Sequence, residues 1–78
     1  MYNIKFHPKS EKDFSKINQK DQKRILKALM YLKKDPYIGK KLKGGFNNYY
    51  SLKIWPYRIV YYIKNNECLI LIIRIGHR

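Results

Sequence analysis

Residues 57–78 read YRIVYYIKNNECLILIIRIGHR, and this stretch decides the fold of the chain. Two runs rich in β-branched and aromatic residues, 57–64 and 67–78, flank the pair Asn65-Asn66. This pattern is typical of a β-hairpin, and asparagine suits a two-residue turn because it tolerates positive φ. The second run is apolar from Leu69 to Ile73, which predicts a strand at the centre of a sheet, covered on both faces.

The two ends of this hairpin carry arginines. Arg58 opens the first strand and Arg78 closes the second. Because the start of one antiparallel strand lies beside the end of its partner, we expect these guanidiniums to meet at one edge of the sheet.

The N-terminal segment predicts a strand followed by a short helix. Residues 2–7 alternate between apolar and polar, which indicates an edge strand that Pro8 ends. Ser10 followed by Asp13 is typical of a helix start. The helix is expected to turn Phe14 and Ile17 inward.

A second helix is predicted to run to about Lys34. Asn18 followed by Asp21 repeats the start signal, and Asp35-Pro36 ends the helix. Its predicted apolar stripe is Ile25, Leu26, Leu29, Met30 and Leu32, and its solvent-facing lysines are Lys20, Lys23, Lys27 and Lys34.

The elements that follow complete an α+β fold. Residues 37–48 are predicted to form a loop, 49–54 a strand, and Trp55-Pro56 a short turn before the hairpin. The expected architecture is one domain over residues 1–78: an N-terminal strand, a helical hairpin, and a three-stranded antiparallel meander in one sheet packed on the helices.

The charge of the chain indicates a polyanionic partner. Lysines and arginines number 18 against 5 aspartates and glutamates, a formal charge of +13. RNA or DNA, an acidic protein and an anionic membrane surface are the partner classes this favours. With no apolar run of about 20 residues and no signal-peptide pattern, we expect a cytoplasmic protein with no membrane partner. The single cysteine, Cys68, suits a reducing compartment and is expected to be a small core residue.

The acidic residues are too few and too scattered to hold catalytic metals. Four of the five lie in the helical region, and only Glu67 follows. One cysteine and two distant histidines, His7 and His77, do not predict a zinc site, and the glycine-rich loop lacks Walker spacing. We therefore expect no metal and no cofactor.

Metal-free cleavage of RNA is compatible with the cations that the hairpin gathers. The ribose 2′-OH is the nucleophile, and the protein must supply a base, cations for the phosphorane and an acid for the leaving 5′-oxygen. The candidates are Lys53, Arg58, His77 and Arg78. A lysine is a weak base near pKa 10.4, and like-charged neighbours favour its neutral form. The alternatives are that Lys53 is a solvated strand lysine, and that Arg58 and Arg78 bind phosphate without a catalytic part. His77 could likewise be an ordinary surface histidine.

A second group of residues is predicted to bind RNA. It comprises Lys40, Lys41 and Lys43 in the loop and, as stacking surfaces for bases, Tyr50 and Trp55, with Tyr49 beside them. The alternative is that the lysines are only solvated and that some tyrosines belong to the core.

Four short motifs in order resemble the RelE/ParE toxin superfamily of bacterial and archaeal toxin–antitoxin pairs. They are Lys41-Leu42-Lys43-Gly44, Tyr50-Ser51-Leu52-Lys53-Ile54, Tyr57-Arg58-Ile59-Val60-Tyr61 and Arg74-Ile75-Gly76-His77-Arg78. The resemblance covers essentially the whole chain and agrees with its element order, length and basic charge.

The resemblance to RelE toxins implies a ribosome-dependent endoribonuclease that cuts mRNA in the A site and leaves a 2′,3′-cyclic phosphate. By position, Lys53 matches a candidate general base, and Arg58 and Arg78 match arginines that hold the scissile phosphate. His77 precedes the second arginine. The implied partners are the ribosome with its mRNA, an acidic RelB-like antitoxin, and operator DNA bound only by the toxin–antitoxin complex.

Two departures from RelE bear on catalysis. Ser51 stands where RelE has a second lysine, and the sequence stops at Arg78, before the tail that carries a catalytic tyrosine in RelE. Two other functions therefore stay open: inhibition of DNA gyrase, as in the ParE branch, and a catalytically weak homologue that acts as antitoxin partner and co-repressor.

Overall fold

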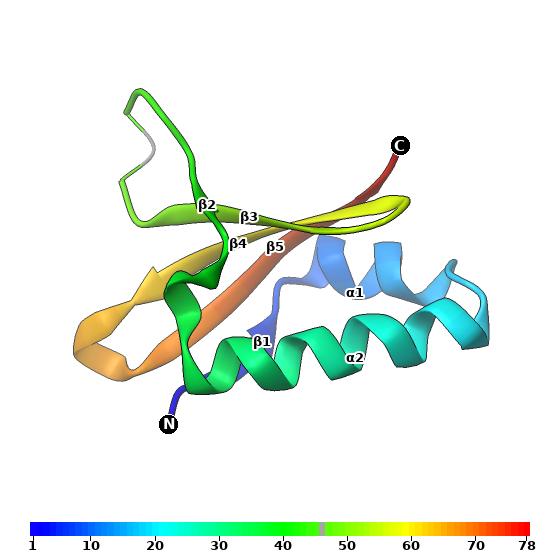
Figure 1. Ribbon diagram of the computed structural model, residues 1–78, viewed down its shortest axis with the longest axis horizontal. Helices are drawn as coiled ribbons and strands as arrows, with labels where there is room; N and C mark the ends of the chain where they lie inside the picture. Colours follow the sequence, from blue (N-terminus) through cyan, green and yellow to red (C-terminus); the bar gives the residue numbers. More distant parts are fainter. Residues whose placement is uncertain (46) are drawn as a thin grey trace.

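The computed structural model describes residues 1–45 and 47–78 as one mixed sheet with two helices packed on one face (Figure 1). The helices are α1 (Pro8–Ser15) and α2 (Gln19–Lys34). The strands are β1 (Asn3–Phe6), β2 (Lys40–Lys41), β3 (Tyr49–Ile54), β4 (Tyr57–Lys64) and β5 (Leu69–His77), with short 3₁₀ turns η1 (Pro36–Ile38) and η2 (Asn65–Glu67).

The sheet has the order β1-β5-β4-β3-β2. The predicted antiparallel meander is formed by β3, β4 and β5, and β1 pairs parallel to β5 at one edge, as the alternation of its residues predicted. The predicted loop over 37–48 was wrong in part, since it contains η1 and a fifth strand, β2, which pairs with β3. Phe46, within that predicted loop, lies outside the described residues.

Only one face of the sheet is buried. The core side of β4 carries Tyr57, Ile59, Tyr61 and Ile63, and all four are buried. Strand β5 is central, as expected, but the prediction that both its faces are covered was wrong. Ile70 and Ile72 are buried, whereas Leu69, Leu71 and Ile73 are only half-buried, because both helices lie on the same side of the sheet (Figure 1).

Helix α1 begins three residues earlier than the sequence predicted, since its N-cap is residue 7 and not residue 10. His7 is its N-cap, with Nδ1 accepting from the Lys9 amide at 3.1 Å, and Pro8 is its first residue. Pro8 thus ends the strand and starts the helix, where its fixed φ and missing N–H are tolerated. Ser10 is buried instead of capping, and its hydroxyl shares one proton between the carbonyl oxygens of His7 at 2.8 Å and Ile72 at 2.7 Å. The inward placement of Phe14 and Ile17 is confirmed.

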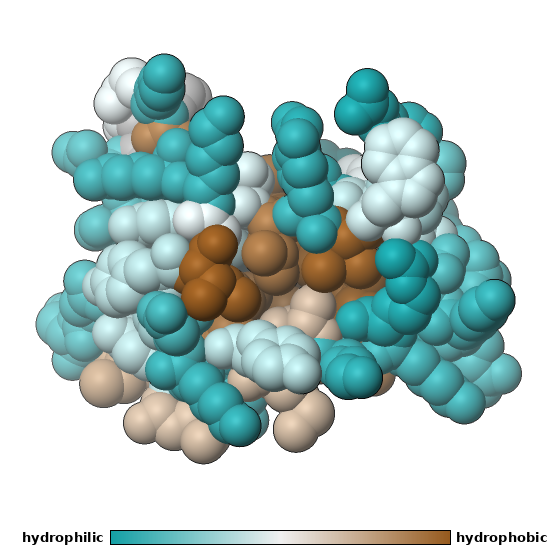
Figure 2. Space-filling view, in the orientation of Figure 1, coloured by the Kyte–Doolittle hydropathy of each residue, from teal (hydrophilic) through white to brown (hydrophobic). Residues whose placement is uncertain are grey.

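Helix α2 starts and ends where the sequence predicted. The Asn18 side chain accepts from the Asp21 amide at 2.9 Å. The predicted apolar stripe was wrong at two positions, since Leu26 is 47% exposed and Met30 is 65% exposed, while Ala28 joins the buried face. Figure 2 shows hydrophobic residues in the hollow between the sheet and α2, and hydrophilic side chains projecting from the opposite side of the sheet. Within residues 1–45 and 47–78, no helix has both the length and the apolar character needed to span a bilayer.

The β4–β5 connection is longer than the predicted two-residue turn. Asn65–Glu67 form η2, and Lys64 pairs with Leu69 across the connection. The residue with positive φ is Cys68, at 48°, rather than an asparagine. Cys68 is exposed, so its expected burial was wrong: it belongs to the connection and not to the strand.

Candidate active site at the edge of the sheet

The register of three strands aligns the candidate catalytic residues. Lys53 of β3 pairs with Arg58 of β4, and Arg58 pairs with Gly76 of β5. Paired residues point to the same face of a sheet, and this row lies on the face away from the helices. The start of β4 therefore lies beside the end of β5, as antiparallel pairing predicted.

These residues line a pocket of about 420 Å³. Its walls are Lys53, Trp55, Pro56, Tyr57, Arg58, Gly76, His77 and Arg78. All four predicted catalytic side chains therefore border one cavity, and all four residues are exposed to solvent. A Cβ added to Gly76 would meet nothing within 4 Å, so the absence of a side chain there keeps the space beside Arg58 open.

Trp55 and Arg78 close one side of the pocket. The Arg78 guanidinium carbon lies 5.3 Å from the centre of the Trp55 ring, which is cation–π distance. The Arg78 amide donates to the Pro56 carbonyl at 2.9 Å, and the Trp55-Pro56 peptide is cis. Trp55 is 68% exposed, so its ring is accessible for stacking, as predicted for an RNA contact.

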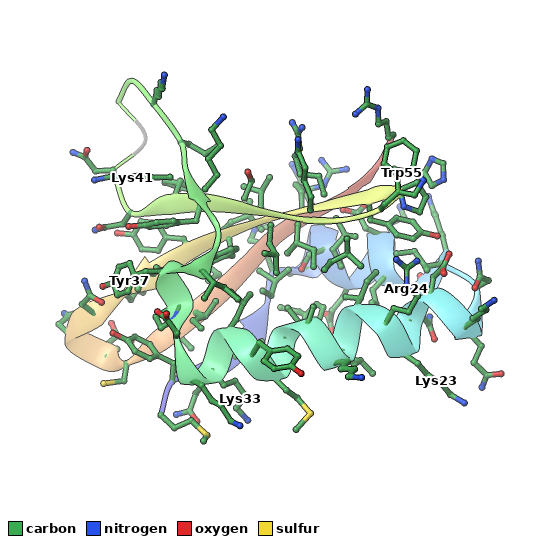
Figure 3. All side chains as sticks on the ribbon, in the orientation of Figure 1. Lys23, Arg24, Lys33, Tyr37, Lys41 and Trp55 are labelled. Atoms are coloured by element: carbon green, nitrogen blue, oxygen red, sulfur yellow. The ribbon has the colours of Figure 1, made fainter. Side chains whose placement is uncertain are left out.

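A polar network from α2 holds the β3–β4 turn in place. Arg24 donates to the Trp55 carbonyl at 2.8 Å and to Asp21 at 3.1 Å, and the Tyr57 hydroxyl donates to Asp21 at 2.8 Å (Figure 3 shows Arg24 beneath Trp55). The hydrogen bond from Tyr57 holds the pKa of Asp21 below its usual value, and the same bond raises the pKa of Tyr57. The Tyr57 ring in turn packs edge-on against His77 at 5.2 Å between centroids.

A second pocket of about 660 Å³ adjoins the first. Its walls are Ile38, Gly39, Lys40, Lys41, Leu42, Lys43, Ser51, Leu52, Lys53 and Arg58. The three loop lysines predicted to bind RNA thus share a cavity with two of the predicted catalytic residues.

Tyr50 does not serve as an RNA-stacking surface. It is only 9% exposed and packs edge-on against Tyr37 and in stacked geometry against Tyr61. The prediction was wrong because Tyr50 pairs with Tyr61 on the core face of the sheet, where no base can reach it. Tyr49 packs on Tyr62 with ring centroids 4.9 Å apart.

The carboxylate of Asp13 binds its partners outside both of these pockets. Asp13 accepts from Arg74 at 2.8 Å and from the Ile75 amide at 3.0 Å, and the bond from Arg74 holds the pKa of Asp13 below its usual value. Within residues 1–45 and 47–78, no three histidine, cysteine, aspartate or glutamate side chains are grouped to hold a metal.

A family model describing the ParE toxin of the type II toxin–antitoxin system parDE matches residues 4–78. The chain belongs to this toxin family. It is thus a member of the RelE/ParE superfamily, as its four motifs suggested. No curated protein sequence matches it.

Solved structures of RelE toxins share the fold of this ParE-family chain. The toxin in the intact Escherichia coli RelBE toxin–antitoxin complex superposes with a TM-score of 0.90 at 23% identity, over 100% of this chain and 98% of that one. The RelBE2 complex of Mycobacterium tuberculosis gives 0.88 at 24% identity, over 99% and 98%. The RelE–RelB complex of Pyrococcus horikoshii gives 0.86 at 21% identity, over 99% and 94%.

Sequence reasoning missed several residues that shape the pocket of this toxin-family member. Gly76 was part of a motif, but its place opposite Arg58 follows only from the hairpin register. Asp21 was predicted only as part of a helix start, and Arg24 was assigned no role. Nothing local in the sequence connects these two residues with a turn some 30 positions away.

Proposed function

We propose that this chain is the toxin of a type II toxin–antitoxin system that cleaves mRNA in the ribosomal A site without a metal ion. The observation that carries the proposal is the convergence of Lys53, Arg58, His77 and Arg78 on one open pocket. Cations concentrated around a phosphate stabilise the charge that develops on it during in-line attack.

The proposed reaction uses the substrate's own nucleophile. Lys53, in its neutral form, takes the proton of the 2′-OH, and the 2′-oxygen forms a bond to the adjacent phosphorus. Arg58 and Arg78 hold the non-bridging oxygens. The bond from phosphorus to the 5′-oxygen breaks, and protonated His77 gives its proton to that oxygen. The products are a 2′,3′-cyclic phosphate and a 5′-hydroxyl.

We also propose an acidic antitoxin as the partner that silences this activity in the cytoplasm. A formal charge of +13 favours an acidic partner. The similar toxins of E. coli, M. tuberculosis and P. horikoshii were all solved in complexes with RelB-type antitoxins, which supports the same arrangement for this chain. Binding of operator DNA is proposed only for the toxin–antitoxin complex.

The test is cleavage on programmed ribosomes. Ribosomes stalled on a defined mRNA receive the wild-type chain, the Lys53→Ala variant, or a Lys27→Ala control that removes one exposed charge from α2. Time points are quenched with EDTA, and the same mRNA without ribosomes is run in parallel.

Cuts within the A-site codon that end in a cyclic phosphate are expected from the wild type and the control. Loss of a general base reduces rates typically by 10²–10⁴-fold, so Lys53→Ala should be nearly inactive. Full activity of Lys53→Ala contradicts the proposal.

A ParE-like inhibitor of DNA gyrase is the second candidate, because the matching family model is that of ParE toxins. It predicts intact mRNA in the ribosome assay and inhibition of gyrase on supercoiled DNA. A chain that acts only as antitoxin partner and co-repressor predicts neither effect, and no growth arrest on expression without antitoxin.

A further inference from the structure

The second pocket continues the candidate active site along the sheet. The two cavities share Lys53 and Arg58, and the second extends from these residues to β2. Lys40 pairs with Ser51, so Lys40, Ser51 and Lys53 lie on the same face of the sheet. One surface therefore runs from Arg78 at the end of β5 to Lys40 on β2.

The cations along this surface have no acidic counterparts. In the part of the chain that the structure describes, the ion pairs are Arg24–Asp21, Lys64–Glu67 and Arg74–Asp13. None involves Lys40, Lys41, Lys43, Lys53, Arg58 or Arg78, and no aspartate or glutamate lines either pocket. Like charges gathered in this way attract a polyanion.

The segment that carries the lysines is fixed to the sheet. The Gly39 amide donates to the Tyr61 hydroxyl at 3.1 Å, and this buried hydroxyl donates to the Pro36 carbonyl at 2.7 Å. Further along, the Leu42 amide donates to the Tyr49 carbonyl at 2.9 Å. The backbone from Gly39 to Leu42 is thus held by hydrogen bonds to the sheet, which favours a smaller loss of entropy on binding.

We propose that the second pocket is a subsite for the nucleotides that adjoin the scissile phosphate on the same single strand of RNA. Lys40 and Lys43 contact its phosphates, and the apolar side chains of Ile38 and Leu42 contact ribose and base. This inference rests on the proposed nuclease function.

The length of the surface sets the number of nucleotides it holds. Neighbouring strands are about 4.8 Å apart, so the three steps from β5 to β2 span about 14 Å. A stacked strand rises about 3.4 Å per nucleotide, and an extended one rises more. The surface therefore accommodates roughly two to four nucleotides. An acidic peptide is disfavoured because the pocket continues into the site where the phosphate would be cut.

The test measures binding of 2′-O-methyl RNA, which lacks the nucleophilic hydroxyl and cannot be cleaved by this route. Fluorescently labelled oligonucleotides of one to six nucleotides are titrated by anisotropy from 0.05 to 0.5 M salt. The variant is Lys40→Gln/Lys43→Gln. The control is Lys23→Gln/Lys27→Gln, which removes the same charge from exposed positions on α2, at the other side of the molecule from β2 (Figure 3 labels Lys23 and Lys41).

For the wild type and the control, affinity should rise up to about four nucleotides and then level off. Two lost phosphate contacts lower the slope of log K against log salt by about 1.4, which corresponds to about 25-fold weaker binding at 0.1 M salt. The Lys40→Gln/Lys43→Gln variant should show this loss on tetranucleotides and almost none on dinucleotides. Thermal unfolding of all three proteins reports on their folding.

Equal losses in variant and control overturn the subsite, because the lysines would then act only through net charge. Unchanged binding by the variant also overturns it and directs attention to an acidic protein as the ligand. Cleavage plays no part in these measurements, so failure of the nuclease proposal appears only in the ribosome assay.

Discussion

Gly39→Ala is expected to loosen the segment that carries the lysines of the second pocket. Gly39 has φ −78° and ψ 174°, an extended conformation open to any residue. Its requirement for glycine is one of space: an added Cβ would overlap the Tyr61 hydroxyl and lie 2.7 Å from the Ser51 carbonyl oxygen. Neither neighbour is free to move, because Tyr61 is fully buried and Ser51 lies in β3.

The size of the effect follows from the bonds at Tyr61. Forcing extra volume into a packed site destabilises by about 1–3 kcal/mol, and leaving a buried hydroxyl without its partner adds about 1–3 kcal/mol. We expect a loss of roughly 2–6 kcal/mol. Since stability per residue is about 0.05–0.15 kcal/mol, the whole domain has only about 4–12 kcal/mol, and the variant should be marginally folded.

A double-mutant cycle identifies the cause. Tyr61→Phe removes the hydroxyl that Gly39 contacts, so the alanine should be less harmful in its presence, and the two losses should fall short of additivity by about 1 kcal/mol or more. The measurement is urea unfolding of the wild type, both single variants and the double variant. A free energy of unfolding of the Gly39→Ala variant equal to that of the wild type would contradict this explanation. So would losses of the two single variants that are strictly additive in the double variant.

Three further outcomes are expected from the same structure. Gly76→Val should keep wild-type thermal stability but abolish cleavage on ribosomes, because its side chain enters an open pocket. Asp13→Asn should lower the free energy of unfolding by about 1 kcal/mol, since it weakens the bonds from Arg74 and from the Ile75 amide. The lowered pKa of Asp13 makes this stabilisation present above about pH 4 and lost as pH falls further, so the variant and wild type should converge in acid unfolding curves. Burial raises the pKa of Tyr61 to about 12, so the folded state holds this proton more tightly than the unfolded chain, and stability should fall between pH 10 and 12. The free energy of unfolding of the Tyr61→Phe variant, measured by the same urea titrations, should fall less steeply over that pH range.

The elements set by local pattern were predictable from the sequence. The β4 and β5 runs, the Asn18 cap and the meander all follow from alternation, capping and β-propensity within a few residues. The meeting of Arg58 with the end of β5 was also predictable, because antiparallel pairing fixes which ends of two strands lie together.

The errors arose where a residue's partner is distant in the sequence. Ser10 has the composition of a cap, but its hydroxyl donates to a carbonyl 62 positions away. Tyr50 looked available to RNA until its pairing with Tyr61 placed it in the core. Cys68 ends the hairpin connection with positive φ, a role that its residue type did not indicate.

The acidic side chains that stabilise this fold lie apart from the basic side chains that line the two pockets. The carboxylates of Asp13 and Asp21 are used in the helical layer, where they tie α1 to β5 and α2 to the β3–β4 turn. No aspartate or glutamate lines either pocket, although repulsion among the cations there lowers the stability of a small domain. A protein selected for stability alone gains by placing an acid there. The presence of cations without acidic partners on the surface of these two pockets therefore favours selection for an anionic ligand. The lysines of α2, which border neither pocket, supply the matched control for each test of that ligand.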